Sequence, residues 1–336
     1  MPHIDVLTKY KTTSLNQLAL LCGLPTNRAN KRSRIESIVN GLNLARKLPP
    51  KVNILSIDIG IKNFSYCQVD SANFDLENHS VVKHWAKINL HDKYGSQYKP
   101  LIDIDTLIDS KRYVNYMCTS LLRDVVDAPD IVVMETQRTR SNNNAITLPN
   151  VLLNYTFENI LYANLYNSLP KSIIIPMTST NMISFWVNRF VTKESLKQFS
   201  KSSKKIRSQL FFHWLEQKSH MKLPNEIQDK GTLMTYLNLQ NGEKIDDLVD
   251  SLLYNITIRT QLSNQISLLK WLDQDLNEFI IRGNLYQLRS IFDLIEKLGL
   301  DWNDDFEPYV DYFFNSGKTS TTDSSIKEFQ SLMKLY

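Results

Sequence analysis

The chain has 336 residues, of which 42% are hydrophobic and 22% charged, and its formal net charge is +4 at pH 7. This composition is that of an ordinary globular protein and excludes fibrous and wholly disordered classes. Only nine residues are Gly, and the three Cys are widely spaced, which disfavours Gly-rich nucleotide folds, disulfide frameworks and zinc ribbons.

The first part of the chain, residues 1–48, is predicted to form a small helical unit. Leu15, Leu18 and Leu21 mark the face of one helix, and a second helix is expected from about Ala29. A Pro-Pro pair follows this unit and predicts a linker to the rest of the chain.

Residues 51–262 are predicted to form an α/β domain. Apolar runs separated by turn signals and helical spacing give the order β-β-β-α-β-α-β-α, which indicates a mixed five-stranded sheet flanked by helices. The expected strands are residues 52–59, 64–69, 81–88, 131–134 and 172–177, and the expected helices between them are 106–127 and 147–168. A further helix is expected at residues 208–219.

Two later segments differ in composition from this domain. Residues 192–206 are rich in Lys and Ser, and we expect a mobile insertion there. Residues 263–336 have helical spacing and an acidic end, which predicts a helical C-terminal extension without chemistry of its own.

Positive charge is concentrated in two stretches of the sequence. Residues 1–50 contain eight Lys or Arg against two acidic residues, and residues 189–207 contain seven against one. Because Lys and Arg displace counterions from phosphates, this segregation favours a polyanionic partner, although a solvated surface explains it as well. The candidate DNA contacts in these stretches are Lys31, Arg32, Arg34, Lys201, Lys204 and Lys205.

Carboxylates at strand ends are the sharpest chemical signal in the sequence. Asp58 interrupts the apolar run of the first strand just before a turn, and Glu135 follows four apolar residues. A buried carboxylate is costly unless it is paired or bound to a metal, so both acids are candidate functional residues.

A third group of acids opens a predicted helix that begins near residue 245. Asp246 and Asp250 lie about 40° apart and flank its apolar stripe, whereas Asp247 is expected to point toward solvent. Acids at a helix start also complement its dipole, which is an alternative reading of Asp246 and Asp247 but not of Asp250.

Four converging carboxylates predict a site for a hard divalent cation. Asp58, Glu135, Asp246 and Asp250, with Asp247 as the substitute for Asp246, would bind Mg²⁺ or Mn²⁺, and we expect two ions per site. The implied reaction is phosphodiester hydrolysis. We expect no nucleotide cofactor, and no membrane partner because no run of about 18 apolar residues occurs.

Three strings together resemble one family. They are Ser-Ile-Asp-Ile-Gly-Ile-Lys-Asn-Phe-Ser-Tyr-Cys at 56–67, Met-Glu-Thr-Gln-Arg-Thr-Arg-Ser at 134–141 and Lys-Ile-Asp-Asp-Leu-Val-Asp-Ser-Leu-Leu at 244–253. Their order and spacing resemble the fungal mitochondrial Holliday junction resolvases, or cruciform-cutting endonucleases, of the RuvC branch of the RNase H-like superfamily. Residues 14–46 resemble a SAP motif, a helical DNA-binding module.

The resemblance implies a mitochondrial homodimer that binds four-way DNA junctions and makes paired symmetric cuts with Mg²⁺ or Mn²⁺. It implies a catalytic, metal-binding set drawn from the acids named above, with either Asp246 or Asp247 as a member. It also implies that Lys62, Arg138 and Arg140 hold phosphates beside them. The C-terminal extension does not map onto the core of that family.

Three other interpretations deserve comparison. An actin-like ATPase or sugar kinase needs further Gly-rich loops, and the chain has no Gly-Gly dipeptide. A catalytically inactive junction-binding or DNA-binding scaffold has no need of the carboxylates. An RNase H-like or transposase-like nuclease with another substrate stays open, because only a comparison of substrates separates it from a resolvase.

Overall fold

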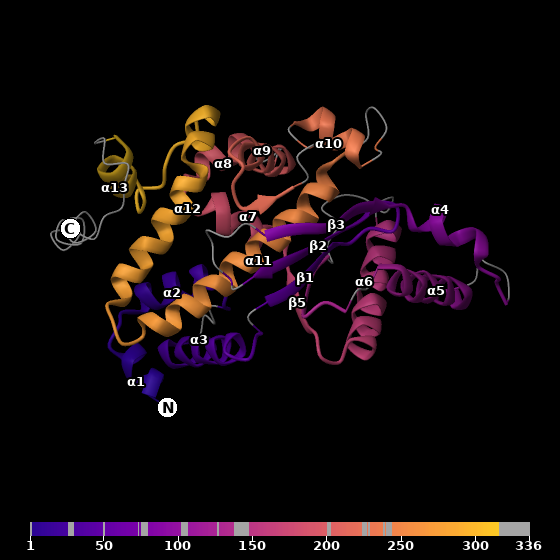
Figure 1. The fold of residues 1–336 in the computed structure, drawn as a ribbon, viewed down its shortest axis with the longest axis horizontal. Coiled ribbons are helices and arrows are strands. Elements are labelled where there is room, and N and C mark those ends of the chain that lie inside the picture. Colours follow the sequence, from indigo (N-terminus) through magenta and orange to yellow (C-terminus); the bar gives the residue numbers. More distant parts are fainter. Residues whose placement is uncertain are drawn as a thin grey trace.

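In a computed structural model of the protein, a mixed sheet lies at the centre and helices cover both of its faces (Figure 1). The described residues are 2–25, 30–49, 51–72, 74, 80–101, 107–125, 128–137, 148–199, 203–223, 227, 229–237, 239 and 244–315. Within them the strands are β1 Lys51–Asp58, β2 Phe64–Ala72, β3 Ser80–Ile88, β4 Ile131–Glu135, β5 Ile173–Met177 and β6 Met221–Lys222.

Among the described residues, three helices precede the first strand, others lie between the strands, and helices alone form the C-terminal part. They are α1 Pro2–Thr8, α2 Thr12–Leu21, α3 Lys31–Ala45, α4 Leu90–Tyr94, α5 Leu107–Val125, α6 Leu148–Ser168, α7 Ser179–Ile183, α8 Lys193–Phe199, α9 Ser203–Glu216, α10 Lys230–Tyr236, α11 Asp246–Trp271, α12 Leu276–Leu298 and α13 Glu307–Val310. Across the described part of the chain, no helix is long and apolar enough to span a membrane.

The sheet order is β5-β4-β1-β2-β3-β6. β1, β2 and β3 are antiparallel neighbours, whereas β4 runs parallel to β1 and β5 parallel to β4. The predicted α/β class and the five predicted strands are confirmed. The count of five was wrong, because β6 is a sixth strand of two residues that pairs only with the start of β3 and is too short to show any periodicity.

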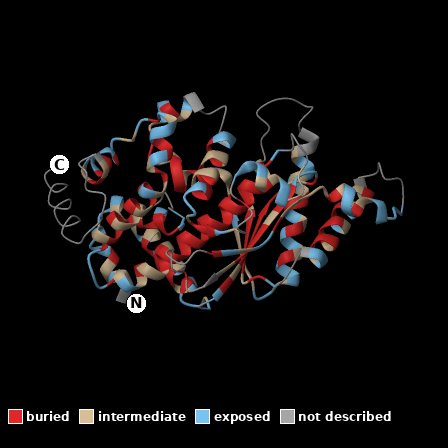
Figure 2. Cartoon of the chain, turned by 45° about the horizontal axis from the view of Figure 1, so that its top comes forward, coloured by how far each residue is buried: buried red, intermediate tan, exposed pale blue. Residues whose placement is uncertain are grey.

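Alternating residues of the central strands belong to two separate hydrophobic cores, one on each face of the sheet. Ile54 and Val133 face α11 and α9, whereas Leu55 and Val132 face α5 and α6. Figure 2 shows buried residues running through the sheet and into the helices on both of its faces. Burial on both faces explains why β1 and β4 read as continuous apolar runs in the sequence.

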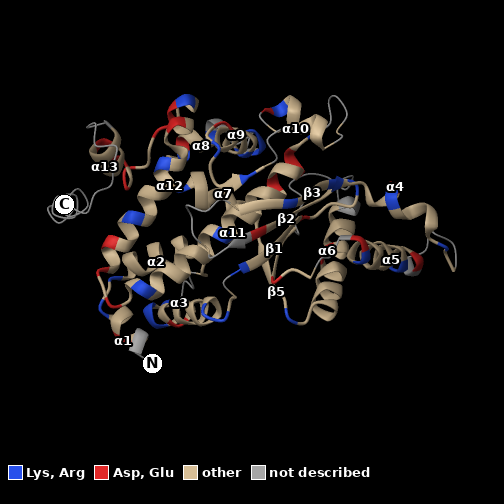
Figure 3. Cartoon of the chain, in the orientation of Figure 1, with Lys and Arg blue, Asp and Glu red and all other residues tan. Residues whose placement is uncertain are grey.

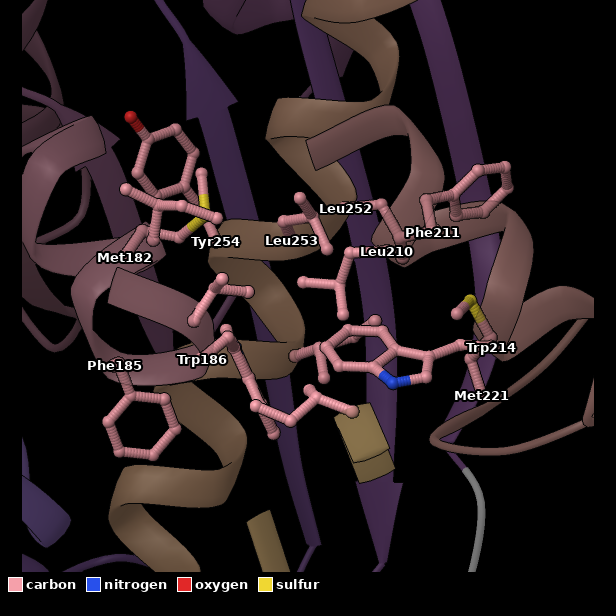
Figure 4. Close-up of a cluster of buried hydrophobic side chains, with 14 of the residues drawn as sticks. Met182, Phe185, Trp186, Leu210, Phe211, Trp214, Met221, Leu252, Leu253 and Tyr254 are labelled. Atoms are coloured by element: carbon pink, nitrogen blue, oxygen red, sulfur yellow. The ribbon is translucent and has the colours of Figure 1, made fainter. Parts of the chain in front are cut away.

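The expectation of a mobile insertion at residues 192–206 was wrong where the structure describes that segment. α8 and α9 are helices, and Ile206, Leu210 and Trp214 are spaced one turn apart and are almost fully buried. Figure 4 shows Leu210 and Trp214 packed with Trp186 and Leu252 in one cluster of buried side chains. The helix predicted at residues 208–219 is confirmed in α9, which begins earlier, at Ser203.

The N-terminal helices pack against the C-terminal part of the chain. Leu18 of α2 and Ile38 of α3 share a buried cluster with Leu268 of α11 and Leu276 of α12. The boundary predicted between residues 262 and 263 falls inside α11, which continues to Trp271. The first 48 residues and the C-terminal extension therefore contribute side chains to one hydrophobic core.

Candidate active site

The ends of β1 and β4 bring two carboxylates together. The two strands are parallel, and Ile57 pairs with Met134, so Asp58 and Glu135 follow at the same edge of the sheet. The charge of Glu135 acts on Asp58, and the Ile59 N–H lies 3.4 Å from the Oε2 of Glu135. Asp58 is only 7% exposed.

The pKa of Asp58 is raised well above its usual range, first by burial, then by the hydrogen bond and negative charge of Glu135, and then by the charges of Asp250 and Asp247. Like charges at short range disfavour ionisation of both members of such a pair.

The first turn of α11 lies over the end of β1. Ser65 of β2 pairs with Asp58, and its hydroxyl donates to the carbonyl oxygen of Asp247 at 2.5 Å. The indole N–H of Trp85 in β3 donates to the carbonyl oxygen of Leu248 at 2.9 Å. These two bonds fix the start of α11 on the sheet and so place its acids beside Asp58.

Asp250 is held by a buried arginine. Nε and Nη2 of Arg207 donate to its two carboxylate oxygens at 2.5 and 2.7 Å, and each side chain is less than a tenth exposed. Burial raises the pKa of Asp250 to about 6, although Arg207 acts in the opposite direction. Arg207 belongs to the basic stretch 189–207, but its ion pair with an acid 43 residues away was not predicted.

Asp246 and Asp247 are both partly buried, with side chains 25% and 19% exposed, but they face different lysines. The Oδ2 of Asp247 lies 3.4 Å from Nζ of Lys87, a largely buried side chain of β3, and the charge of Asp247 acts on Asp58. Asp246 is more exposed, and its Oδ2 lies 3.8 Å from Nζ of Lys204. The expectation that Asp247 points farther toward solvent was wrong, because β3 lies on its side of the helix.

A divalent cation needs oxygen donors, and the acid cluster supplies carboxylates. In the described part of the chain, no group of three or more His, Cys, Asp or Glu side chains is arranged to hold a metal ion. Asp250 faces Arg207 and Asp247 faces Lys87. Asp58 and Glu135 are close enough for the charge of Glu135 to act on Asp58, and one or two carboxylates with water and phosphate suit Mg²⁺. Among these acids, the Asp58–Glu135 pair fits a hard cation.

Three further residues border this cluster and are not among the site residues predicted from the sequence. The Gln137 carboxamide donates to Oε2 of Glu135, and the Gln137 N–H donates to the Glu158 carboxylate. Tyr254 lies one turn after Asp250, and its buried hydroxyl has no hydrogen-bond partner among the described residues. Burial, followed by the charges of Glu135, Asp58 and Asp250, raises the pKa of Tyr254. The spacing from Asp250 could have identified Tyr254, whereas Glu158 comes from a distant helix.

The predicted DNA contacts lie in different parts of the molecule. Lys62 is exposed in the turn after β1, and Lys204 and Lys205 are exposed on α9 near the acids of α11. Arg138, Arg140 and Lys201 lie outside the described residues. Figure 3 shows that the Lys and Arg residues of α3 are separated from the acids at the start of α11.

The three basic residues of α3 have individual contacts. Nζ of Lys31 donates to the Thr8 carbonyl at 2.5 Å, and Arg32 pairs with Glu36. The Nε of Arg34 is buried without a partner among the described residues. α3 packs against α11 near Leu268, which follows Asp250 by 18 residues and so lies about 27 Å from it along the helix axis. These basic residues could therefore contact only DNA distant from the acids.

The fold and the acids together define a class of protein. An antiparallel three-stranded meander joined to two parallel strands, with carboxylates at the ends of β1 and β4 and on a helix across the sheet, is the RNase H-like arrangement. The family model described as "Mitochondrial resolvase Ydc2 / RNA splicing MRS1" matches residues 54–268. The chain belongs to this family.

Two curated relatives and one solved structure are similar to the chain. "Cruciform cutting endonuclease 1, mitochondrial" of Saccharomyces cerevisiae is 30% identical over 219 residues, which cover 60% of this chain and 61% of that protein. The protein of the same name from Schizosaccharomyces pombe is 28% identical over 214 residues, covering 61% of this chain and 76% of that one.

The crystal structure of the yeast mitochondrial Holliday junction resolvase Ydc2 matches with a TM-score of 0.55 and 21% identity. The match covers 78% of this chain and 98% of that one, and it supports the fold. The family match begins at residue 54, so the SAP-like character of residues 1–48 stays a prediction.

Proposed function

We propose that this chain is a structure-selective endonuclease that resolves four-way DNA junctions by metal-dependent phosphodiester hydrolysis. The observation that carries the proposal is the buried Asp58–Glu135 contact, surrounded by the charges of Asp247 and Asp250. A scaffold that only binds DNA gains nothing from acids that repel one another in a buried site. Two relatives named cruciform cutting endonucleases support the choice of substrate.

The proposed metal ligands are Asp58 and Glu135, with Asp250 and Asp247 completing the set. We assign the fourth position to Asp247 rather than Asp246, because Asp247 acts on Asp58 and Asp246 is turned toward Lys204. When bound, two Mg²⁺ or Mn²⁺ ions would supply Lewis acidity at the scissile phosphate and at the leaving oxygen.

The surrounding basic residues have their own part in this proposal. Arg207 keeps Asp250 charge-compensated and oriented before any ligand arrives, and Lys87 does the same for Asp247. Lys62, Lys204 and Lys205 are exposed on nearby elements and would hold backbone phosphates of the DNA. Arg138, Arg140 and Lys201 are proposed for the same role from the sequence.

A homodimer is part of the proposal because a four-way junction has approximate two-fold symmetry and two strands must be cut. The exposed face of α6 supports it. Leu152, Tyr155, Tyr162 and Tyr166 are 37–68% exposed and lie within about 80° of the helix circumference. Their spacing repeats the 3-4 pattern of helix pairing, and two such stripes would bury on the order of 1,000 Å².

The dimer part has a direct test in solution. Tyr162→Glu places a charge in the middle of the α6 stripe and should shift the protein from dimer to monomer in sedimentation. His84→Glu, at an exposed position on β3, is the matched control and should leave the dimer intact. A wild-type protein that sediments as a monomer at micromolar concentration would contradict the homodimer.

A mitochondrial location is proposed on the names of the relatives, both of which are called mitochondrial. The basic N-terminal stretch is compatible with import, and DNA binding explains the same charges. Import of a fluorescent fusion into mitochondria would support the location, and an exclusively nuclear or cytosolic signal would overturn it.

The substrate is tested with a synthetic four-way junction, a linear duplex of the same sequence and a folded RNA. Each is incubated with Mg²⁺ and with chelator. We expect paired incisions confined to the junction and dependent on the metal. Binding of the junction without cutting would indicate the inactive scaffold, and cutting of all substrates would indicate an RNase H-like nuclease of another specificity.

A further inference from the structure

Gln137 connects the two strand ends that carry Asp58 and Glu135. Its Nε2 donates to Oε2 of Glu135 at 2.8 Å and to the carbonyl oxygen of Ile59 at 3.1 Å. Ile59 directly follows Asp58, so one carboxamide bridges the residue after the first candidate ligand to the second candidate ligand. The Ile59 N–H adds a longer contact to the same Glu135 oxygen at 3.4 Å.

Gln137 is itself anchored by α6. The carboxylate of Glu158 accepts a hydrogen bond from the Gln137 backbone N–H at 2.9 Å. Glu158 is only 8% exposed, and its helix is fixed on the sheet by buried Phe157 and Leu161. The position of Gln137, which follows the end of β4 by two residues, is therefore set by a rigid element and not by the loop alone.

We propose that Gln137 and Glu158 are positioning residues that hold the Glu135 carboxylate against Asp58 in the geometry for cation binding. The inference deepens the proposed function and rests on it. A Glu side chain has three rotatable bonds, and a free carboxylate at a strand end would lose conformational entropy each time it bound a cation. A donor that already fixes one of its oxygens removes that cost, as outer partners of metal ligands commonly do.

Glu158 lies on the same helix as the proposed dimer face. At 100° per residue, Glu158 lies between the buried face of α6 at Phe157 and Leu161 and the exposed stripe at Tyr155 and Tyr162. The same helix therefore carries the proposed dimer face and the anchor of Gln137. A change in the packing of α6 would reach Glu135 through two hydrogen bonds.

The test measures Mn²⁺ affinity directly, by titration of free Mn²⁺ in electron paramagnetic resonance, together with junction binding in chelator and the thermal midpoint. We expect Gln137→Ala and Glu158→Ala to weaken Mn²⁺ binding about tenfold and to leave junction affinity in chelator unchanged. Gln217→Ala is the matched control, because Gln217 also donates to a carboxylate, that of Asp293, outside the acid cluster. It should bind Mn²⁺ like the wild type.

Glu158→Gln keeps an oxygen acceptor for the Gln137 N–H and should restore most of the affinity lost in Glu158→Ala. If Gln137→Ala does not fold, the pair of Glu158 variants decides alone. Equal Mn²⁺ affinity in wild type, Gln137→Ala and Glu158→Ala would overturn the inference, and so would the absence of any Mn²⁺ binding by the wild type.

The inference and the proposed function fail in different ways. A wild type that cuts junctions while Gln137→Ala binds Mn²⁺ normally refutes the positioning role alone. A wild type that binds Mn²⁺ more tightly than Gln137→Ala but cuts no junction refutes the resolvase proposal and supports the positioning role.

Discussion

The acids of the strand ends and the acids of α11 occupy one site but are stabilised in opposite ways. Asp58 and Glu135 contact each other, and no Lys or Arg ion pair is recorded for either within the described residues. Asp250 and Asp247 each face a buried cation, Arg207 and Lys87. The strand pair is thus short of positive charge and the helix pair is already compensated, which identifies the strand pair as the place where a cation is most needed.

The largest expected effect comes from the strand pair. Asp58→Asn removes one acid of the Asp58–Glu135 contact, and we expect cleavage of a four-way junction to fall by about 10³-fold or more, since metal charge stabilisation is worth several kcal/mol. Junction affinity in chelator should stay the same, because it rests on Lys and Arg. Cleavage assays and fluorescence anisotropy measure the two quantities. Cutting by the variant at the wild-type rate would remove Asp58 from the site.

For the acids of α11, removal of a counterion should lower the stability of the folded protein. Arg207→Met leaves Asp250 buried without its counterion, and we expect the free energy of unfolding to fall by about 3–5 kcal/mol in urea titrations. Arg32→Met is the matched control, because the Arg32–Glu36 pair is exposed, and it should cost less than about 1 kcal/mol. Equal losses for the two variants would show that the buried pair carries no special stability.

The two acids at the start of α11 should differ from each other. Asp247→Asn removes a charge that acts on Asp58, and we expect cleavage to fall about 10²-fold, equivalent to about 2.7 kcal/mol of transition-state stabilisation. Asp246→Asn changes a side chain that faces Lys204 and should alter the rate by less than about threefold. If Asp246→Asn lowered the single-turnover cleavage rate more than Asp247→Asn did, Asp246 and not Asp247 would be the metal ligand.

The smallest effect is a pH dependence of stability in metal-free buffer. Burial and neighbouring acids raise the pKa of Asp58, and the pKa of Asp250 is raised to about 6, so the folded state keeps protons that the unfolded state releases. The stability is present in full below about pH 4 and declines as the pH rises toward and past 6. Asp58→Asn removes one of these groups, so its free energy of unfolding should fall less between pH 4.5 and pH 7 than that of the wild type.

A comparison of urea titrations at the two pH values measures this difference. Mn²⁺ should reduce the decline in the wild type and not in the variant, because a bound cation offsets the negative charge that Asp58 gains as the pH rises. Parallel pH profiles for the two proteins would contradict the raised pKa of Asp58.

Local patterns carried most of the fold prediction. The five longer strands and the helices between them are predicted because each is a continuous apolar run or an amphipathic repeat in one stretch of sequence. β6 has only two residues, so it has no local pattern strong enough to be read. It pairs with the start of β3, which lies far away in the sequence.

The candidate site was also predicted only in part from the sequence. Asp58 and Glu135 end apolar strands, and parallel pairing brings such ends together, so the sequence could place them. The choice between Asp246 and Asp247 depends on which side of α11 meets β3, and helical periodicity alone does not contain that information. Arg207 and Glu158 reach the site from helices far away in the chain, so only the tertiary structure could find them.

Paired cutting can be measured on a supercoiled plasmid that extrudes a cruciform. We expect the wild-type protein with Mg²⁺ to convert it to linear DNA through two incisions at the junction, and Asp58→Asn to leave it intact while still binding it. Linear product from the variant, or no incision by the wild type in the presence of Mg²⁺, would show that these acids do not form the active site of a junction-cutting enzyme.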